Sequence, residues 1–300
     1  MQRRLCIVAI IISGTWMAYG VRADEGSTDT NQVTRLPAAK VIGERLEEDQ
    51  PVGPYQQPEW TTARRFATTR VYLQQPPWGF GVEQWVKMQY PRGEAPNYLL
   101  QEEVEMGLPY RFQADVYENW IINEHHTVYH HDVATELRWA LADWGKIPLN
   151  PTLYGEWKFV DADQGADVYE LKLLFGEDLA PRWHWGLNLI YEQEVGQSRT
   201  TEWEASQGVS YTVIDEKLGL GVEIKVESET EQGARSNAPI EVDIGPSLQW
   251  RPTRGSHLDV VPLFGVTGDS PNVETWIVFG IDFGPGHERA SAAPVSTSSQ

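Results

Sequence analysis

Apolar and polar residues alternate through most of the chain, and the stretch from Glu136 to Phe159 shows the pattern most clearly. This stretch, ELRWALADWGKIPLNPTLYGEWKF, alternates on both sides of a Pro/Asn-rich turn, with Leu137 and Trp139 on one face and Glu136 and Arg138 on the other. Alternation with a period of two, interrupted by a turn, is typical of an antiparallel β-hairpin. The pattern leaves one question, which is whether the tryptophans point into a core or outward into lipid.

The same alternation continues from residue 80 to residue 284 as about twelve runs separated by turn residues. Each run is close to the 9–11 residues that a tilted transmembrane strand requires. Tight turns marked by Pro or Asp alternate with more polar connections. An even number of strands puts both ends of the chain on one side of the membrane, the periplasmic side, so the polar connections are expected to be extracellular.

A soluble β-sandwich shows the same alternation, so a second observation is needed to choose between the two folds. Tryptophan and tyrosine gather at the ends of the runs, as in the aromatic girdles of outer-membrane barrels. The charged face also mixes acids and bases at neighbouring positions, as expected in a confined lumen. The sequence therefore predicts an all-β fold, an antiparallel transmembrane β-barrel of about 12 strands with an N-terminal periplasmic extension.

The two ends of the chain differ from the barrel region. Residues 1–23 have a basic start, an apolar stretch and small residues at the end, which is the pattern of a secretory signal peptide cleaved between Ala23 and Asp24. Residues 24–79 are read as a periplasmic extension that is either a plug in the barrel mouth or a tether, and we prefer the tether. Residues 80–284 form the barrel, and residues 285–300 are a polar low-complexity tail. The expected location is the outer membrane of a Gram-negative-type cell.

Cysteine usage and charge exclude several functions. The only cysteine, Cys6, lies in the signal peptide, so the mature chain is expected to have no thiol chemistry, disulfide or cysteine-based metal site. Removal of residues 1–23 takes away three arginines and no acid, which changes the formal net charge from −19 to −22. This charge argues against a nucleic-acid partner and is compatible with a lumen that attracts cations.

The charged face of the runs supplies the candidate functional residues. The predicted lumen-lining side chains are Glu103, Glu105, Arg111, Asp115, Arg138, Glu156, Lys158, Glu170, Lys172, Glu202, Glu204, Glu241 and Asp243. Unpaired acids among them would line a cation-favouring path. Acids that pair with the bases would instead form a structural network that fills a narrow barrel, and the sequence leaves both alternatives open.

The segment NEHHTVYHHD contains four of the seven histidines and is the one candidate for metal or acid–base chemistry. His125, His126 and His130 are weak metal-ligand candidates, and a His130–Asp132 pair at the rim is the alternative for an outer-membrane enzyme. Alternation sends His130 and Asp132 to the lumen and His131 to the outer face, so the imidazoles are not expected to converge. We therefore expect no catalytic residue, no bound metal and no cofactor.

The strand pattern and the LADWGKIPLNPTLYGEWKF hairpin give residues 80–284 a resemblance to outer-membrane barrels of the phenol-degradation meta-pathway, a transporter-like family. The resemblance implies uptake of small aromatic or other compounds. One departure is that the last run stops at Phe283 and a polar tail follows, whereas such barrels commonly end on an aromatic residue that the assembly machinery reads.

These observations predict an outer-membrane barrel that mediates passage or uptake of a small solute through an acidic lumen. The family resemblance implies that this solute is hydrophobic or aromatic. The expected partners are outer-membrane lipid, the small-molecule solute and the barrel-assembly machinery. A closed structural barrel without transport is the alternative.

Overall fold

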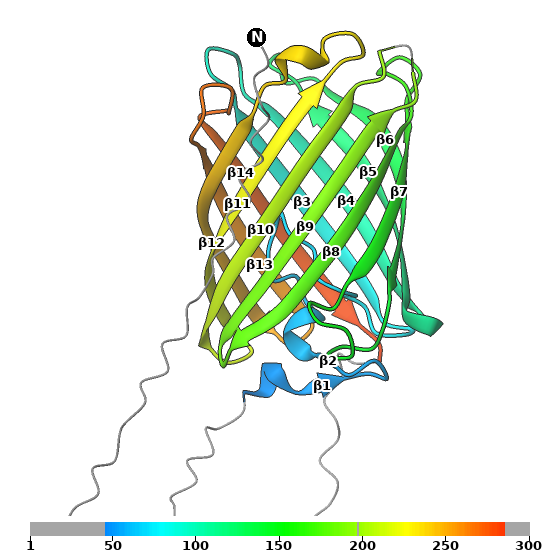
Figure 1. The fold of residues 1–300 in the computed structure, drawn as a ribbon, viewed down its shortest axis with the longest axis vertical. Coiled ribbons are helices and arrows are strands. Elements are labelled where there is room, and N and C mark those ends of the chain that lie inside the picture. Colours follow the sequence, from blue (N-terminus) through cyan, green and yellow to red (C-terminus); the bar gives the residue numbers. More distant parts are fainter. Residues whose placement is uncertain (1–45, 197, 286–300) are drawn as a thin grey trace, which may run out of the picture. The chain divides into compact units, whose positions relative to one another are not determined.

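The computed structural model describes residues 46–196 and 198–285, so the predicted signal peptide and the C-terminal tail lie outside the described residues. Twelve antiparallel strands, β3 to β14, pair with their sequence neighbours, and β14 pairs with β3 to close a barrel (Figure 1). The strands are β3 (Phe80–Tyr90), β4 (Asn97–Leu108), β5 (Phe112–Ile122), β6 (Val128–Ala140), β7 (Thr152–Val160), β8 (Val168–Ala180), β9 (Trp183–Glu194), β10 (Thr201–Ile214), β11 (Leu218–Thr230), β12 (Glu241–Thr253), β13 (Ser256–Gly265) and β14 (Val273–Phe283). The predicted all-β antiparallel barrel is confirmed.

The structure shows which face of the hairpin of residues 136–159 points outward. Trp139 and Leu137 in β6 are 38% and 49% exposed on the outer surface, whereas Glu136 and Arg138 between them are 3% and 1% exposed on the lumen side. A water-soluble fold would have buried the tryptophans instead. Exposed large apolar side chains recur on every strand, so the barrel has an apolar outer surface suited to lipid.

The two ends of the barrel have different connections. At the end where β3 begins, several turns contain residues with a positive φ, such as Arg182 (φ 71°) and Glu216 (φ 58°), and these turns are tight. The strands extend up to these turns, since β8 continues to Ala180 and β12 to Thr253. One connection at the end where β3 begins is long, residues 141–151 between β6 and β7. The opposite end, called the loop end here, carries connections of five to ten residues and the short 3-10 helix η4 (Arg235–Asn237).

Within the described residues, no helix has the length and apolar character needed to cross a membrane.

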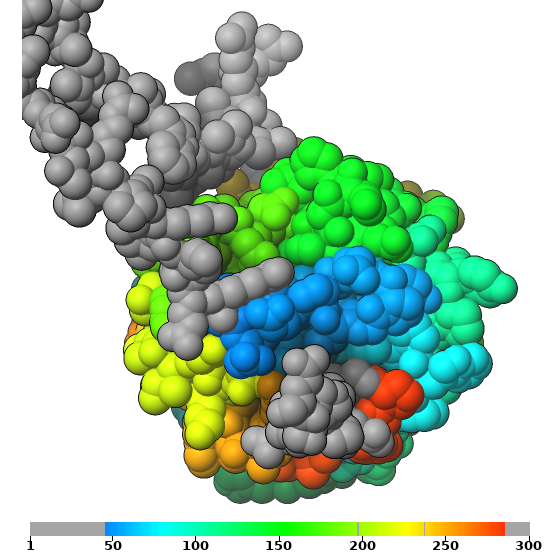
Figure 2. Space-filling model, turned by 90° about the horizontal axis from the view of Figure 1, so that it is seen from below, coloured from blue at the N-terminus to red at the C-terminus, as the bar shows by residue number. Residues whose placement is uncertain are grey.

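Residues 46–79, called the plug here, cover one end of the barrel and enter its lumen. They contain η1 (Glu47–Asp49), a two-stranded sheet of β1 (Pro51–Val52) and β2 (Gln57–Pro58), and η2 (Glu59–Thr61). The first part of the plug extends across the end of the barrel opposite the loop end (Figure 2), and the rest continues into the lumen. The described part of the predicted extension is therefore not a plain tether.

The apolar core of the molecule is small and lies where the plug meets the wall. One cluster of buried residues packs Ala67 of the plug against Trp85 and Leu263, and a second contains Tyr72, Leu73 and the wall residue Ala140. Most other buried side chains in the lumen are polar or charged. Polar contacts therefore contribute much of the attachment between plug and barrel.

Candidate functional site: the barrel lumen and its plug

Two arginines of the plug bind acids of the barrel wall. Arg64 Nη2 lies 2.6 Å from Glu83 Oε2, and Arg70 lies 3.1 Å from Glu103 and 3.4 Å from Glu105. All five side chains are at most 10% exposed. A buried ion pair is very costly to break from one side, because the remaining charge has no water to solvate it.

The plug backbone is held by side chains of the wall. Glu223 accepts hydrogen bonds from the backbone N–H groups of Ala67 and Thr68, at 3.1 and 2.8 Å. Asn188 accepts one from the N–H of Arg70 and donates one to its carbonyl oxygen, both at 2.7 Å. These contacts fix the position of the plug along the lumen, because they bind particular backbone groups.

Glycines in the wall make room for apolar plug side chains. A Cβ atom at Gly208 of β10 would lie 2.7 Å from Cγ of Phe66, and one at Gly186 of β9 would lie 2.7 Å from a methyl group of Val71. Carbon atoms in contact are normally about 3.5–4.0 Å apart. Side chains larger than glycine at these two positions would therefore force the plug to move.

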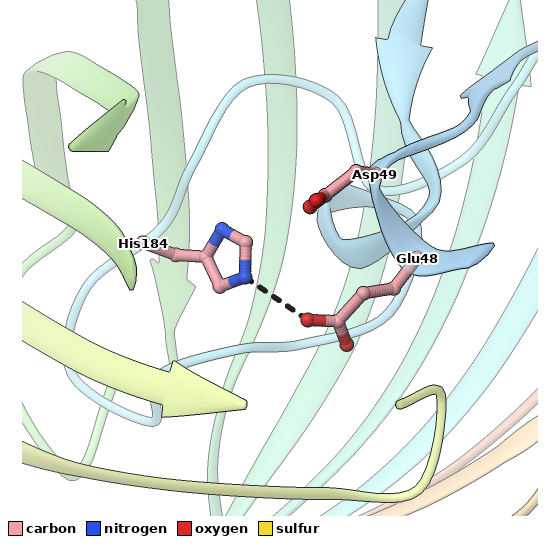
Figure 3. Close-up of side chains that lie close together, drawn as sticks. All are labelled: Glu48, Asp49 and His184. Carbon is pink, nitrogen blue, oxygen red and sulfur yellow. Dashed lines mark hydrogen bonds and ion pairs between the residues drawn. The ribbon is translucent and has the colours of Figure 1, made fainter. Parts of the chain in front are cut away.

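A second group of contacts holds the beginning of the plug against β9 (Figure 3). The two nitrogens of His184 lie 3.0 Å from Glu48 and 2.8 Å from Asp178, and Trp60 donates a hydrogen bond to Asp178 at 2.7 Å. Burial alone would raise the pKa of Glu48, but the hydrogen bond from His184 and the charge of Arg65 lower it to about 2. We call the contact between Glu48 and His184 the latch.

Glu48, Asp49 and His184 also place one potential metal-ligand atom each within 4.8 Å of the others. Both nitrogens of His184 already face carboxylates, however, and Glu48 faces Arg65 at 3.3 Å. These contacts within the chain explain why the three side chains lie close together without a metal ion: they attach the plug to the barrel wall.

Acidic side chains follow one another in register around the lumen. The row, one acid from each of eight neighbouring strands, consists of Glu105, Asp115, Glu136, Glu156, Glu170, Glu192, Glu202 and Glu229. Because barrel strands are tilted, a row of paired residues climbs around the wall. The acidic row therefore leads from the plug, which contacts Glu105, to the loop end, where Glu229 lies next to the last residue of β11.

Basic residues neutralise the row only in part. Arg138 binds Asp115 at 2.9 Å and also contacts Glu136, while Lys172 binds Glu170 at 2.6 Å. Lys158 binds Glu192 at 2.6 Å and Glu156 at 3.5 Å. In the part of the chain that the structure describes, Glu202 and Glu204 form no ion pair, so the excess negative charge lies towards the loop end.

Twelve of the thirteen predicted lumen residues lie on the lumen-facing side of their strands, and Arg111 does not. Tyr110 and Arg111 have φ angles of 61° and 66°, which place them in a turn after β4 where strand alternation no longer applies. Arg111 there donates to the carbonyl oxygen of Ala140 and pairs with Asp143 at 3.2 Å. Arg111 therefore belongs to the turns at the plug end.

The histidine cluster is also arranged differently from the prediction. The register shifts between Asn119 and Trp120, so that His131 is an extra residue on β6 and His130 pairs with Trp120. Such a bulge reverses the alternation, which places His130 with Trp120 on the outer face and leaves Asp132 in the lumen. His130 bonds Asp161 at 2.9 Å, so it forms no dyad with Asp132.

The metal-ligand candidates do not converge either. His125 is exposed in the loop after β5 and faces Glu124 at 3.4 Å, and His126 follows it in the same loop. Among the described residues, neither they nor His130 belong to a group of three converging ligands.

The lumen widens at the loop end beside β3 to β6. A cavity of about 750 Å³ there is lined in part by Lys87, Leu99, Ile121, Glu124 and Tyr129. By contrast, a cavity lined by Trp60, Arg64 and Arg70 of the plug has a volume of only about 10 Å³, which is near the limit for a single water molecule. Most plug side chains around it are buried, whereas the loop end of the lumen is hollow.

Several important residues were not singled out from the sequence. Glu48 and His184 come from distant segments, and no local pattern connects them. Glu136 and Glu192 lie on the charged face of their runs, but their place in the acidic row depends on strand register. The basic residues Arg64, Arg65 and Arg70 in an acidic protein are the usable sequence signal for the plug.

Comparison with known proteins supports the fold. No protein-family model and no curated protein matches the chain. Solved structures with a similar fold include an outer membrane channel from Pseudomonas putida F1, with a TM-score of 0.50, 10% sequence identity and coverage of 71% of this chain and 98% of that chain. The NanC porin has a TM-score of 0.46 at 14% identity and covers 68% of this chain and 99% of its own.

The likeness to the Pseudomonas putida F1 channel shows the fold of an outer-membrane barrel. The resemblance to the phenol-degradation family stays a prediction.

Proposed function

We propose that this protein is an outer-membrane channel for small solutes that favours positively charged ones and is closed at one end by its plug. The observation that carries the proposal is the acidic row, which leads along the wall from the plug to the loop end. Fixed negative charge in a narrow lumen attracts cations and repels anions. The likeness to an outer membrane channel supports the same class of function.

The plug end would face the periplasm, and a solute would enter from the loop end. Twelve strands give a bore between the filled small barrels and the open porins, which limits passage to small molecules. The cavity at the loop end has apolar walls at Leu99, Ile121 and Tyr129, opposite in the ring of strands to the acidic β10–β12. An organic cation with an apolar or aromatic part would suit both surfaces. No catalytic role is part of this proposal.

Charge selectivity of the current through a planar lipid bilayer tests the proposal. We expect little current for the chain from residue 24, whose lumen the plug closes, and a cation-selective current for a chain that begins at Phe80. The reversal potential of the shorter chain should shift towards zero in its Glu202→Gln/Glu204→Gln variant. The control is Glu102→Gln, which removes an exposed acid from the outer face of β4. A current with no cation preference would contradict the proposal, as would equal shifts in the lumen variant and the control.

A closed structural barrel is the second candidate, because the plug is attached by buried ion pairs and by backbone hydrogen bonds at several levels of the lumen. In that case the full chain and a chain without the plug would both be electrically silent.

A further inference from the structure

Three acids on the lumen side of β11 and β12 lie unusually close together at the loop end. One carboxylate oxygen from each of Glu227, Glu241 and Asp243 lies within 4.8 Å of the others. Glu227 pairs directly with Glu241 across the two strands and with Glu204 on the other side. Like charges opposite each other destabilise a sheet. Of the three acids, Glu227 alone forms an ion pair in the described part of the chain, with Lys225, so the positive charge here is smaller than the negative charge.

Asp243 shows most clearly that a ligand fits here. Its side chain is fully buried, and in the described part of the chain neither carboxylate oxygen accepts a hydrogen bond of normal geometry, although the Ser270 hydroxyl is near enough to interact with it. Lys225 is opposite in register, but its ammonium group lies 2.9 Å from Glu227 and 2.8 Å from Glu274. The hydroxyl of Ser270, which is close by, donates to the carbonyl oxygen of Val242.

The geometry points to a Ca²⁺ site formed by Glu227, Glu241 and Asp243 in the lumen at the loop end. Ca²⁺ binds oxygen ligands at about 2.3–2.6 Å, so two ligands on opposite sides of the ion are up to about 5 Å apart. The spacing of the three carboxylates falls within that limit. All ligands are oxygen atoms, which suit Ca²⁺ better than Zn²⁺ or Cu²⁺, and water can complete the coordination shell.

A bound divalent cation would also have a structural effect. The cation would neutralise Glu227, Glu241 and Asp243, whose charge Lys225 balances only in part. It would also join β11 to β12 near the loops. Ca²⁺ would thus stabilise this side of the barrel wall, whether or not the barrel conducts.

Equilibrium binding of radioactive calcium to the chain from residue 24, in detergent, tests the site. A background of about 0.15 M NaCl screens loosely held counter-ions. We expect a dissociation constant of about 10⁻⁴–10⁻³ M, as in the calcium sites of extracellular modules. The Glu241→Gln/Asp243→Asn variant should bind at least ~10-fold more weakly, because it removes two of the three charged ligands.

The control is Asp163→Asn, which removes an exposed acid from the loop between β7 and β8 and should leave the affinity unchanged. Heat-modifiable migration on a gel shows that each variant is a folded barrel. The assignment is overturned if the folded wild-type chain binds no Ca²⁺ under these conditions. It is equally overturned if the two-site variant and Asp163→Asn bind Ca²⁺ with the same affinity as the wild type.

Discussion

Replacing Glu48 by Gln should loosen the plug by removing the charged half of the latch. In the docked plug the pKa of Glu48 falls from 4.5 to about 2, because the hydrogen bond from His184 and the charge of Arg65 outweigh the opposing effect of burial. A downward shift of this size corresponds to about 3 kcal/mol in favour of the docked state at neutral pH. Gln has nearly the same shape and can still accept a hydrogen bond, so the loss should be smaller than this limit.

Thiol labelling can measure how often the plug leaves the lumen. The chain from residue 24 has no cysteine, and Thr69 in the plug is 2% exposed, so Thr69→Cys introduces one buried thiol. When undocking is fast compared with labelling, the labelling rate follows the undocked population. With about 1.4 kcal/mol per factor of ten, Glu48→Gln should accelerate labelling between about 10-fold and 100-fold at pH 7.

Glu47 provides a matched control for this experiment. It is the neighbouring residue, carries the same charge and has an exposed side chain. Glu47→Gln should therefore leave the labelling rate close to that of the Thr69→Cys parent. Equal labelling rates in the Glu47→Gln and Glu48→Gln variants would refute the idea that the latch holds the plug.

The same thiol probe tests three further changes. Gly208→Ala should accelerate labelling, since overpacking against Phe66 costs about 1–3 kcal/mol, and Phe66→Leu in the same chain should reverse the effect. Acid should also release the plug: the depressed pKa of Glu48 stabilises the docked state above pH 4.5, and this stabilisation is lost as the pH falls towards 2. Dithiodipyridine, which reacts with thiols in acid, should show faster labelling below pH 4.5 in the parent and a flatter profile in Glu48→Gln. Arg70→Met should release the plug more than Glu48→Gln does, since an unpaired buried charge at Glu103 costs about 3–5 kcal/mol. A labelling rate unchanged by any one of these substitutions would show that the contact concerned does not hold the plug.

The barrel could be predicted from the sequence because the face on which a strand residue lies follows from its immediate neighbours in the chain. Each strand of the barrel alternates between lipid and lumen, so a residue such as Trp157 next to Glu156 shows its face without knowledge of the rest of the fold. The prediction failed where this local rule stops, at the turn that contains Arg111 and at the bulge that turns His130 outward. An extra residue such as His131 cannot be recognised from the alternation of apolar and polar residues alone.

The plug could not be assigned from the sequence for a different reason. Its polar composition is typical of an extension in solvent, and its burial depends on partners more than a hundred residues away, such as Asn188 and Glu223. The acidic row is also invisible in the linear sequence, because it exists only once the strand register is known. Acids such as Glu136 and Glu192 become neighbours of other acids through pairing across strands.

Single-channel current in planar lipid bilayers, compared between the chain from residue 24 and a chain that begins at Phe80, tests the central claim most directly. Both proteins are first shown to be folded barrels by heat-modifiable migration. The account predicts that the shorter chain has the larger conductance and the stronger cation preference, because the deletion opens the lumen and removes Arg64 and Arg70 from its acids. A folded shorter chain that conducts no better than the longer one would contradict the account.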